Sequence, residues 1–136
     1  MSLALTKAAV QAAAIHGQVE CPVTHEFADG LYTRRLFIPA GTLVIGKVHT
    51  RQTMNICAMG DISILTTKGA KRFKAGDVVV SAPGIQKVGY AHEDTVWVNV
   101  WATHETDVNR LEALLATDPI TSIEAREFLA LAGVQQ

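Results

Sequence analysis

Closely spaced turns containing glycine, proline or aspartate divide the middle of the chain into short segments. Between about residues 19 and 103 they occur at Asp29-Gly30, Pro39-Ala40-Gly41, Gly60-Asp61, Lys68-Gly69, Ala75-Gly76-Asp77 and Pro83-Gly84. The segments between these turns are rich in β-branched and aromatic residues and are too short for helices. Short strands joined by tight turns predict an antiparallel β-sandwich or barrel, and they exclude a βαβ fold.

Seven of these segments are the best strand candidates, and eight or nine strands are expected in all. The candidates cover residues 31–38, 42–48, 55–59, 62–67, 77–81, 86–91 and 95–101. In the last of them Val96, Val98 and Val100 alternate with Trp97, Asn99 and Trp101. Side chains along a strand point to alternate faces, so both faces carry large apolar groups and both need a covering helix or subunit.

The two ends of the chain are expected to form helices of a single domain, which pack either on their own barrel or on a neighbouring copy. Residues 1–18 are rich in alanine and form the expected N-terminal helix, residues 19–103 the barrel, and residues 104–136 two C-terminal helices. The first C-terminal helix follows the N-cap candidate Asp107 and has apolar residues at Val108, Leu111, Leu114 and Leu115. The second follows the capping-box spacing of Thr121 and Glu124 and includes Phe128 and Leu131.

Composition and charge exclude several classes of protein. The formal net charge is −1 and the pI is near 6.5, which argues against nucleic-acid binding, because that needs a concentrated basic surface. The pairs Arg34-Arg35 and Lys71-Arg72 are expected on the solvated sides of strands. No stretch approaches the roughly 20 apolar residues of a membrane span, and Cys21 and Cys57 have no metal-site spacing.

The order of turns resembles that of the cupins. Gly41, His49 and Gly60-Asp61 fit the first cupin motif, and Gly76-Asp77 with Pro83-Gly84 fit the second. The resemblance covers about residues 31–101 and implies a mainly β, jelly-roll fold. In metal-binding cupins these motifs carry the ligands of one metal ion.

A narrower resemblance, over about residues 21–115, is to uncharacterised cupin-like proteins of tailed bacteriophages. It is carried by residues 38–42, 46–49, 83–97 and 103–107. It implies a phage or prophage origin, with the host cytoplasm during infection or the virion as the location. It implies no settled activity.

Most of the metal ligands of the cupin motifs are replaced. His49 matches one histidine position, whereas Lys47 occupies the other and Thr53 the glutamate position. The third histidine position holds Gln86 or Lys87. A single imidazole does not hold a divalent ion, so we expect no metal and no cofactor. A metal site, if one were present, would combine His49 with His92 and His25.

Three functions follow from these observations. The favoured one is a non-enzymatic homo-oligomeric module of a bacteriophage, structural or associated with the particle, with itself and other phage proteins as partners. The residues expected at its interfaces are Trp97, Trp101, Leu111, Leu114, Leu115, Phe128 and Leu131.

The two alternatives place chemistry in the barrel. A metal-free pocket for a small anion would use His49, Lys47, Arg51, Lys87 and Tyr90 at the barrel mouth. A metal-dependent enzyme would use His49 as a ligand and Lys87 or Tyr90 as an acid or base. No residue is otherwise expected to be catalytic, and the balance is against an enzyme.

Overall fold

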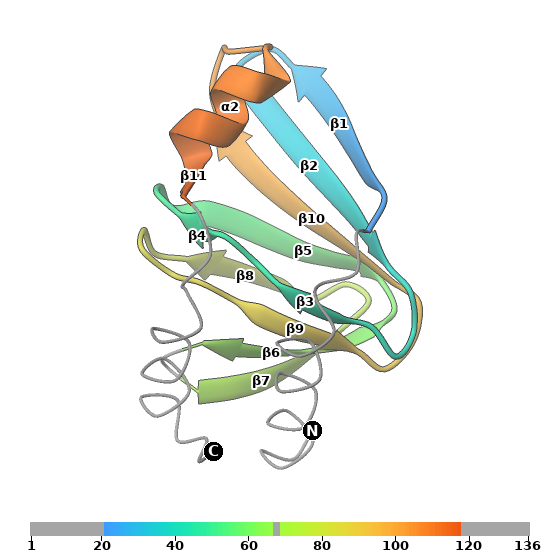
Figure 1. The fold of residues 1–136 in the computed structure, drawn as a ribbon. Coiled ribbons are helices and arrows are strands. Elements are labelled where there is room, and N and C mark those ends of the chain that lie inside the picture. Colours follow the sequence, from blue (N-terminus) through green and yellow to red (C-terminus); the bar gives the residue numbers. More distant parts are fainter. Residues whose placement is uncertain (1–20, 67–68, 118–136) are drawn as a thin grey trace.

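Two antiparallel sheets face each other across the interior of the molecule (Figure 1). The computed structural model describes residues 21–66 and 69–117. One sheet has the order β1-β2-β10-β5-β8 and the other the order β3-β9-β6-β7, while β4 pairs with β11 beside them. This confirms the predicted mainly β, jelly-roll architecture.

The strands fall close to their predicted positions. The five-stranded sheet is built from β1 (Val23–Ala28), β2 (Leu31–Ile38), β5 (Thr53–Met59), β8 (Val78–Ser81) and β10 (Thr95–Ala102). The four-stranded sheet is built from β3 (Leu43–Ile45), β6 (Asp61–Thr66), β7 (Gly69–Lys74) and β9 (Val88–Ala91). The small pair is β4 (Val48–His49) with β11 (Ala116–Thr117). Of these, β1, β7 and β11 were not among the seven predicted segments.

One helix, α2 (Val108–Leu115), lies within the described part of the chain. Its N-cap is Asp107, whose side chain accepts a hydrogen bond from the Arg110 N–H at 3.0 Å, as the sequence predicts. The expected N-terminal helix and the second C-terminal helix lie outside the described residues. None of the described helical structure is long and apolar enough to span a membrane.

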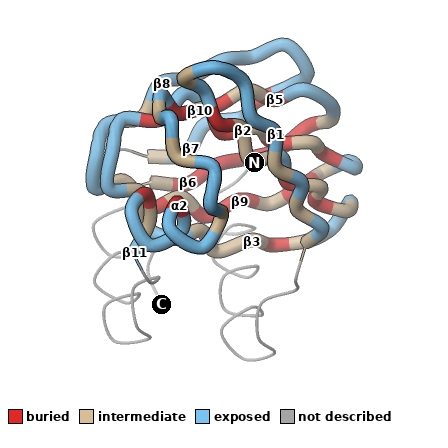
Figure 2. Tube along the Cα trace, turned by 90° about the horizontal axis from the view of Figure 1, so that it is seen from above, coloured by how far each residue is buried: buried red, intermediate tan, exposed pale blue. Residues whose placement is uncertain are grey.

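Alternation along the strands builds the core between the sheets (Figure 2). In β10 the tryptophans and Asn99 are buried, while the valines between them are half-buried. The main cluster joins both sheets and comprises Leu36, Ile38, Cys57, Ile62, Ile64, Phe73, Ala91 and Trp97. Removal of this apolar surface from water is the main stabilising contribution to the fold.

A second cluster closes one end of the barrel. Leu111 and Leu115 of α2 are 0% and 2% exposed and pack with Tyr32 and Trp101. The chain then runs directly into β11, where Ala116 pairs with His49. The helix therefore holds β4 and His49 against the barrel.

Burial inside the subunit overturns part of the interface prediction. Trp97, Trp101, Leu111 and Leu115 are all 5% exposed or less, so the prediction that they contact a partner is wrong. Their side chains fill the interior instead. Leu114 is 44% exposed, and Phe128 and Leu131 lie outside the described residues.

The exposed large apolar residues gather on the five-stranded sheet. We define the outer apolar face as the outward-pointing side chains of β2, β5, β8 and β10: Leu31, Phe37, Met54, Ile56, Val78, Val80, Val96, Val98 and Val100. Met54 pairs in register with Val80, and these two are 44% and 51% exposed. Arg35, on the same side, is neutralised by Glu26 of β1 at 2.9 Å.

Candidate functional site: a cationic cavity between the sheets

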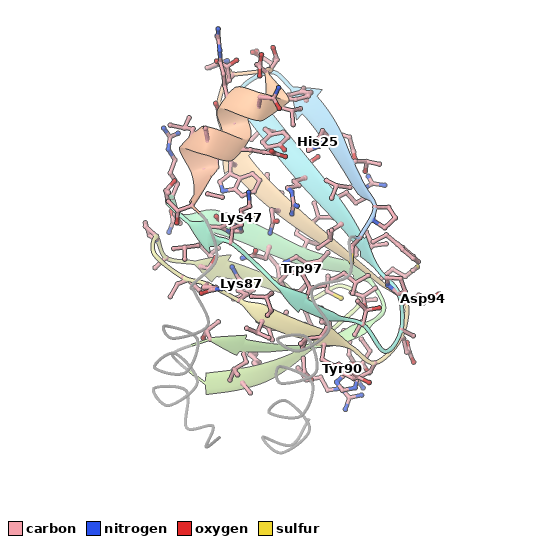
Figure 3. All side chains as sticks on the ribbon, in the orientation of Figure 1. His25, Lys47, Lys87, Tyr90, Asp94 and Trp97 are labelled. Atoms are coloured by element: carbon pink, nitrogen blue, oxygen red, sulfur yellow. The ribbon has the colours of Figure 1, made fainter. Side chains whose placement is uncertain are left out.

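A cavity of about 610 Å³ lies between the two sheets, at the end that α2 closes. Apolar side chains of both sheets form much of its wall, among them Leu36, Ile62, Ile64, Trp97 and Trp101. Polar side chains enter from the five-stranded sheet and from the segment before β9. Figure 3 shows Lys47 and Lys87 in this region. A volume of this size accepts a small organic molecule, since ligand pockets span roughly 300–1,000 Å³.

Arg34 points into this cavity. It lies on the same face of β2 as Tyr32, Leu36 and Ile38, all of which are buried in the interior. The expectation that Arg34 and Arg35 both lie on a solvated strand side is therefore correct only for Arg35. The strand period places neighbours on opposite faces, so one arginine of the pair had to point inward.

A row of polar side chains crosses the inner face of the five-stranded sheet beside Arg34. Asn99 is its register partner on β10, and Asn55 is the partner of Asn99 on β5. The Asn99 side-chain amide donates to Asn55 Oδ1 at 2.8 Å, and both residues are 3% exposed or less. These buried amides are hydrogen-bonded and hold the row in one arrangement.

Ser81 connects this row to Lys87. Its Oγ accepts hydrogen bonds from Asn55 Nδ2 at 3.1 Å and from Lys87 Nζ at 3.0 Å. The same hydroxyl donates to the Thr53 carbonyl at 3.4 Å. A serine hydroxyl offers one donor and two lone pairs, so Ser81 has no further capacity. Lys87 is thereby fixed at a defined place in the cavity wall.

Most of the donors of Arg34 and Lys87 have no protein acceptor in the described residues. Lys87 has three N–H groups and uses one, on Ser81. Arg34 has five, and none of them makes a hydrogen bond or ion pair to a described residue. Glu112, exposed on α2, is the one described carboxylate at the wall of the cavity. The cavity therefore has an excess of positive charge and unmatched donors.

His49 and Lys87 are both electrostatically perturbed. The pKa of His49 is lowered to about 4, mainly by burial and in smaller part by the nearby charges of Lys87 and Arg34. Burial lowers the pKa of Lys87 to about 8. Both shifts have the sign expected when a cation loses its water. At neutral pH His49 is therefore neutral, and its ring packs edge-on against Trp101.

The residues at the cupin metal positions do not fit a metal ion. Thr53 is completely buried, and its Oγ1 accepts from Trp101 Nε1 at 2.7 Å and donates to the Arg51 carbonyl. Gln86 donates its side-chain amide to the Gly46 carbonyl, and Lys47 is a cation. Within residues 21–66 and 69–117 no three His, Cys, Asp or Glu side chains form a group that could hold a metal.

The three histidines named for a metal site are not brought together. His49 lines the cavity, whereas His92 bonds Ser63 Oγ at 2.7 Å on the opposite side of β6 from the core residues Ile62 and Ile64. His25 of β1 bonds the Tyr32 hydroxyl at 2.6 Å. The proposed combination of His49, His92 and His25 is therefore wrong as a ligand set.

The predicted anion-site residues are partly brought together. His49, Lys47 and Lys87 line the cavity, while Arg51 is exposed and does not. Tyr90 lies at the far side of β9, away from Lys47 and Lys87 (Figure 3). It is the register partner of Ser63, and its ring packs against that of His92. The sequence reasoning missed Arg34, Asn99 and Ser81. The alternation of β2 carried a signal for Arg34, but nothing local indicated the contact between Ser81 and Lys87.

Solved structures of similar shape identify the fold. A Cupin 2 conserved barrel domain protein from Salinispora arenicola has a TM-score of 0.54 and 16% identity, over 69% of this chain and 82% of that one. A cupin-family protein with a double-stranded β-helix fold from Methanocaldococcus jannaschii has a TM-score of 0.53 and 12% identity, over 62% and 82%. The chain has the cupin fold.

A cupin domain from Bordetella pertussis gives the same result, with a TM-score of 0.51, 13% identity, and 63% of this chain and 96% of that one covered. No protein-family model matches the chain. No curated protein matches it either. At these low identities the cupin comparisons describe the fold alone.

The low pKa of His49 makes stability depend on pH. Its folded pKa, about 4, lies below the ordinary 6.5, so the unfolded chain binds the extra proton between these values. The folded protein keeps its full stability with respect to this group above pH 6.5, where His49 is neutral in both states. It loses stability as the pH falls towards 4, because protonation of His49 favours the unfolded chain. Between pH 7 and 4.5 wild type should lose about 2 kcal/mol more unfolding free energy than His49→Gln, measured by urea titration.

The surface histidine His104 provides the control. A His104→Gln variant should follow the pH dependence of wild type, because its side chain is 83% exposed. Parallel pH curves for wild type and His49→Gln would show that the buried imidazole does not carry this effect.

Proposed function

We propose that the cavity binds a small organic anion without a metal ion. The observation that carries this proposal is the pair Arg34 and Lys87, two cations in one cavity wall that form no ion pair with a described carboxylate. Holding such charges away from water costs stability unless a counter-charge is supplied. A bound anion supplies it.

The donor arrangement favours a carboxylate. Arg34 carries a planar guanidinium, which binds the two oxygens of a carboxylate side by side. Lys87 approaches from the segment before β9 and acts as a second, compact charge. Asn99, beside Arg34 in register, is a neighbouring polar group. The apolar wall of Leu36, Ile64 and Trp97 would contact the carbon skeleton of the ligand.

Separate substitution of the inward-pointing Arg34 and the outward-pointing Arg35 tests this proposal. Arg34→Gln should weaken binding of small carboxylates at least tenfold, or about 1.4 kcal/mol, because it removes the planar cation of the site. Arg35→Gln is the matched control, since Arg35 pairs with Glu26 outside the cavity and should leave affinity unchanged. Titration calorimetry with pyruvate, lactate, malonate and inorganic phosphate measures both.

Two results would contradict an anion site. One is equal loss of affinity in the Arg34→Gln and Arg35→Gln variants, which would indicate a general charge effect. The other is the absence of binding by every anion tested, together with no organic anion released when the purified protein is denatured.

A second role, self-association, is favoured by the outer apolar face. Met54, Val78 and Val80 of this face are 44%, 56% and 51% exposed, and the neighbouring Arg35 is paired with Glu26. An exposed apolar surface of this kind marks a protein contact. A twofold pairing would cover the same face on both copies at once, which makes a second copy of this chain the natural partner.

A charge placed on this face tests the pairing. Val80→Lys should convert a dimer into monomer in sedimentation equilibrium, because it buries an unpaired ammonium group at the contact. Leu114→Lys is the control, since Leu114 is equally exposed but lies on α2. Dissociation by Leu114→Lys and not by Val80→Lys would assign the contact to the helix instead.

The association with bacteriophage particles, the other phage partners and the location in host cytoplasm or virion stay predictions. They rest on the sequence resemblance alone. The cavity and the outer apolar face are compatible with such a module, since one could bind a ligand while the other joins copies.

A further inference from the structure

We propose that Lys87 forms a Schiff base with the carbonyl group of a small 2-oxo acid whose carboxylate is bound by Arg34. This inference rests on the proposed anion site and specifies its ligand class. It also assigns Lys87 a covalent role, so the site would be reactive as well as binding. Three features of the cavity support it.

The first feature is the position of the amine. Lys87 Nζ is held at 3.0 Å by Ser81 Oγ, and no described carboxylate pairs with it. Ser81 is itself fixed by Asn55, which is fully buried. The amine is therefore held in a fixed position. Its two other N–H groups make no hydrogen bond to a described residue.

The second feature is the reactivity of that amine. Burial brings its pKa to about 8, so roughly a tenth of Lys87 is the neutral nucleophile at pH 7, far more than for an exposed lysine. The third feature is a separate cation, Arg34, in the same cavity wall. Because Arg34 is free of ion pairs, it can take the carboxylate and leave Lys87 for the adjacent carbonyl.

The reaction balances without an oxidant or reductant. The neutral amine attacks the carbonyl carbon, a C–N bond forms, and the carbonyl electron pair moves to oxygen, which takes up a proton while the attacking nitrogen gives up one of its two. Loss of that hydroxyl as water, with a proton from nitrogen, leaves the C=N bond. One amine and one ketone thus give one imine and one water. Asn99 and the neutral imidazole of His49 are polar groups in the same cavity.

Reductive trapping tests the proposal directly. Full-length protein is incubated with pyruvate and sodium cyanoborohydride, and the modified lysines are identified by peptide mass spectrometry. We expect one reduced pyruvate adduct per chain, on Lys87, formed at least tenfold faster than on Lys47. Lys47 is the internal control because it lies at the same cavity but is exposed.

Two variants separate the roles of the side chains. Ser81→Ala should slow trapping at Lys87 because the amine loses its support. Arg34→Gln should slow trapping of pyruvate but not of hydroxyacetone, which has the carbonyl and lacks the carboxylate. Circular dichroism confirms that each variant is folded, and unchanged trapping in a folded Arg34→Gln variant would overturn the assigned role of Arg34.

The outcomes distinguish this inference from the anion site itself. If pyruvate and lactate bind with similar affinity and Lys87 is trapped no faster than Lys47, the Schiff base is wrong while the anion site stands. If neither acid binds and nothing is trapped, both proposals are wrong. Selective labelling of Lys87 by pyruvate supports both.

Discussion

The hydrogen bonds that meet at Ser81 determine how the interior of this barrel is arranged. Its hydroxyl joins the buried amide of Asn55, the backbone of Thr53 and the ammonium group of Lys87. Asn55 in turn accepts from Asn99, so one continuous network runs across three strands of the five-stranded sheet. Because each side chain in the network supplies the hydrogen-bond partner of the next, the polar groups are fixed in an otherwise apolar wall. The network thereby positions Lys87, one of the two cations of the cavity.

The chemistry of the cavity follows from the sign of that charge. A metal-binding interior gathers imidazoles and carboxylates, which attract a cation. Here Arg34 and Lys87 face the cavity, Thr53 and Gln86 are used in internal hydrogen bonds, and His49 stays neutral. The same fold thus presents donors where a metal site presents acceptors. An anionic ligand is the partner that matches both the charge and the unmatched N–H groups.

The turns allowed much of the fold to be predicted, whereas the site needed the structure. Strands such as β2 and β10 follow from turn residues and alternation, which are local properties of the chain. Arg34 could have been placed inside by the same alternation, but two adjacent arginines favoured a solvated strand. The hydrogen bond between Asn55 and Ser81 joins residues 26 positions apart on paired strands. It depends on the register of those strands, which could not be predicted from the sequence. The tryptophans were assigned to an interface because alternation says which residues share a face, and not which face is covered.

The most direct test of this account is the unfolding free energy of the ligand-free Lys87→Met variant at pH 7. If Lys87 is an uncompensated charge that awaits an anion, its removal should stabilise the folded protein. The expected net gain is about 1–2 kcal/mol, which already allows for the lost hydrogen bond to Ser81. The matched Lys47→Met variant, altered at an exposed site, should change little. A Lys87→Met variant that is less stable than both wild type and Lys47→Met would show that Lys87 serves the fold and not a ligand.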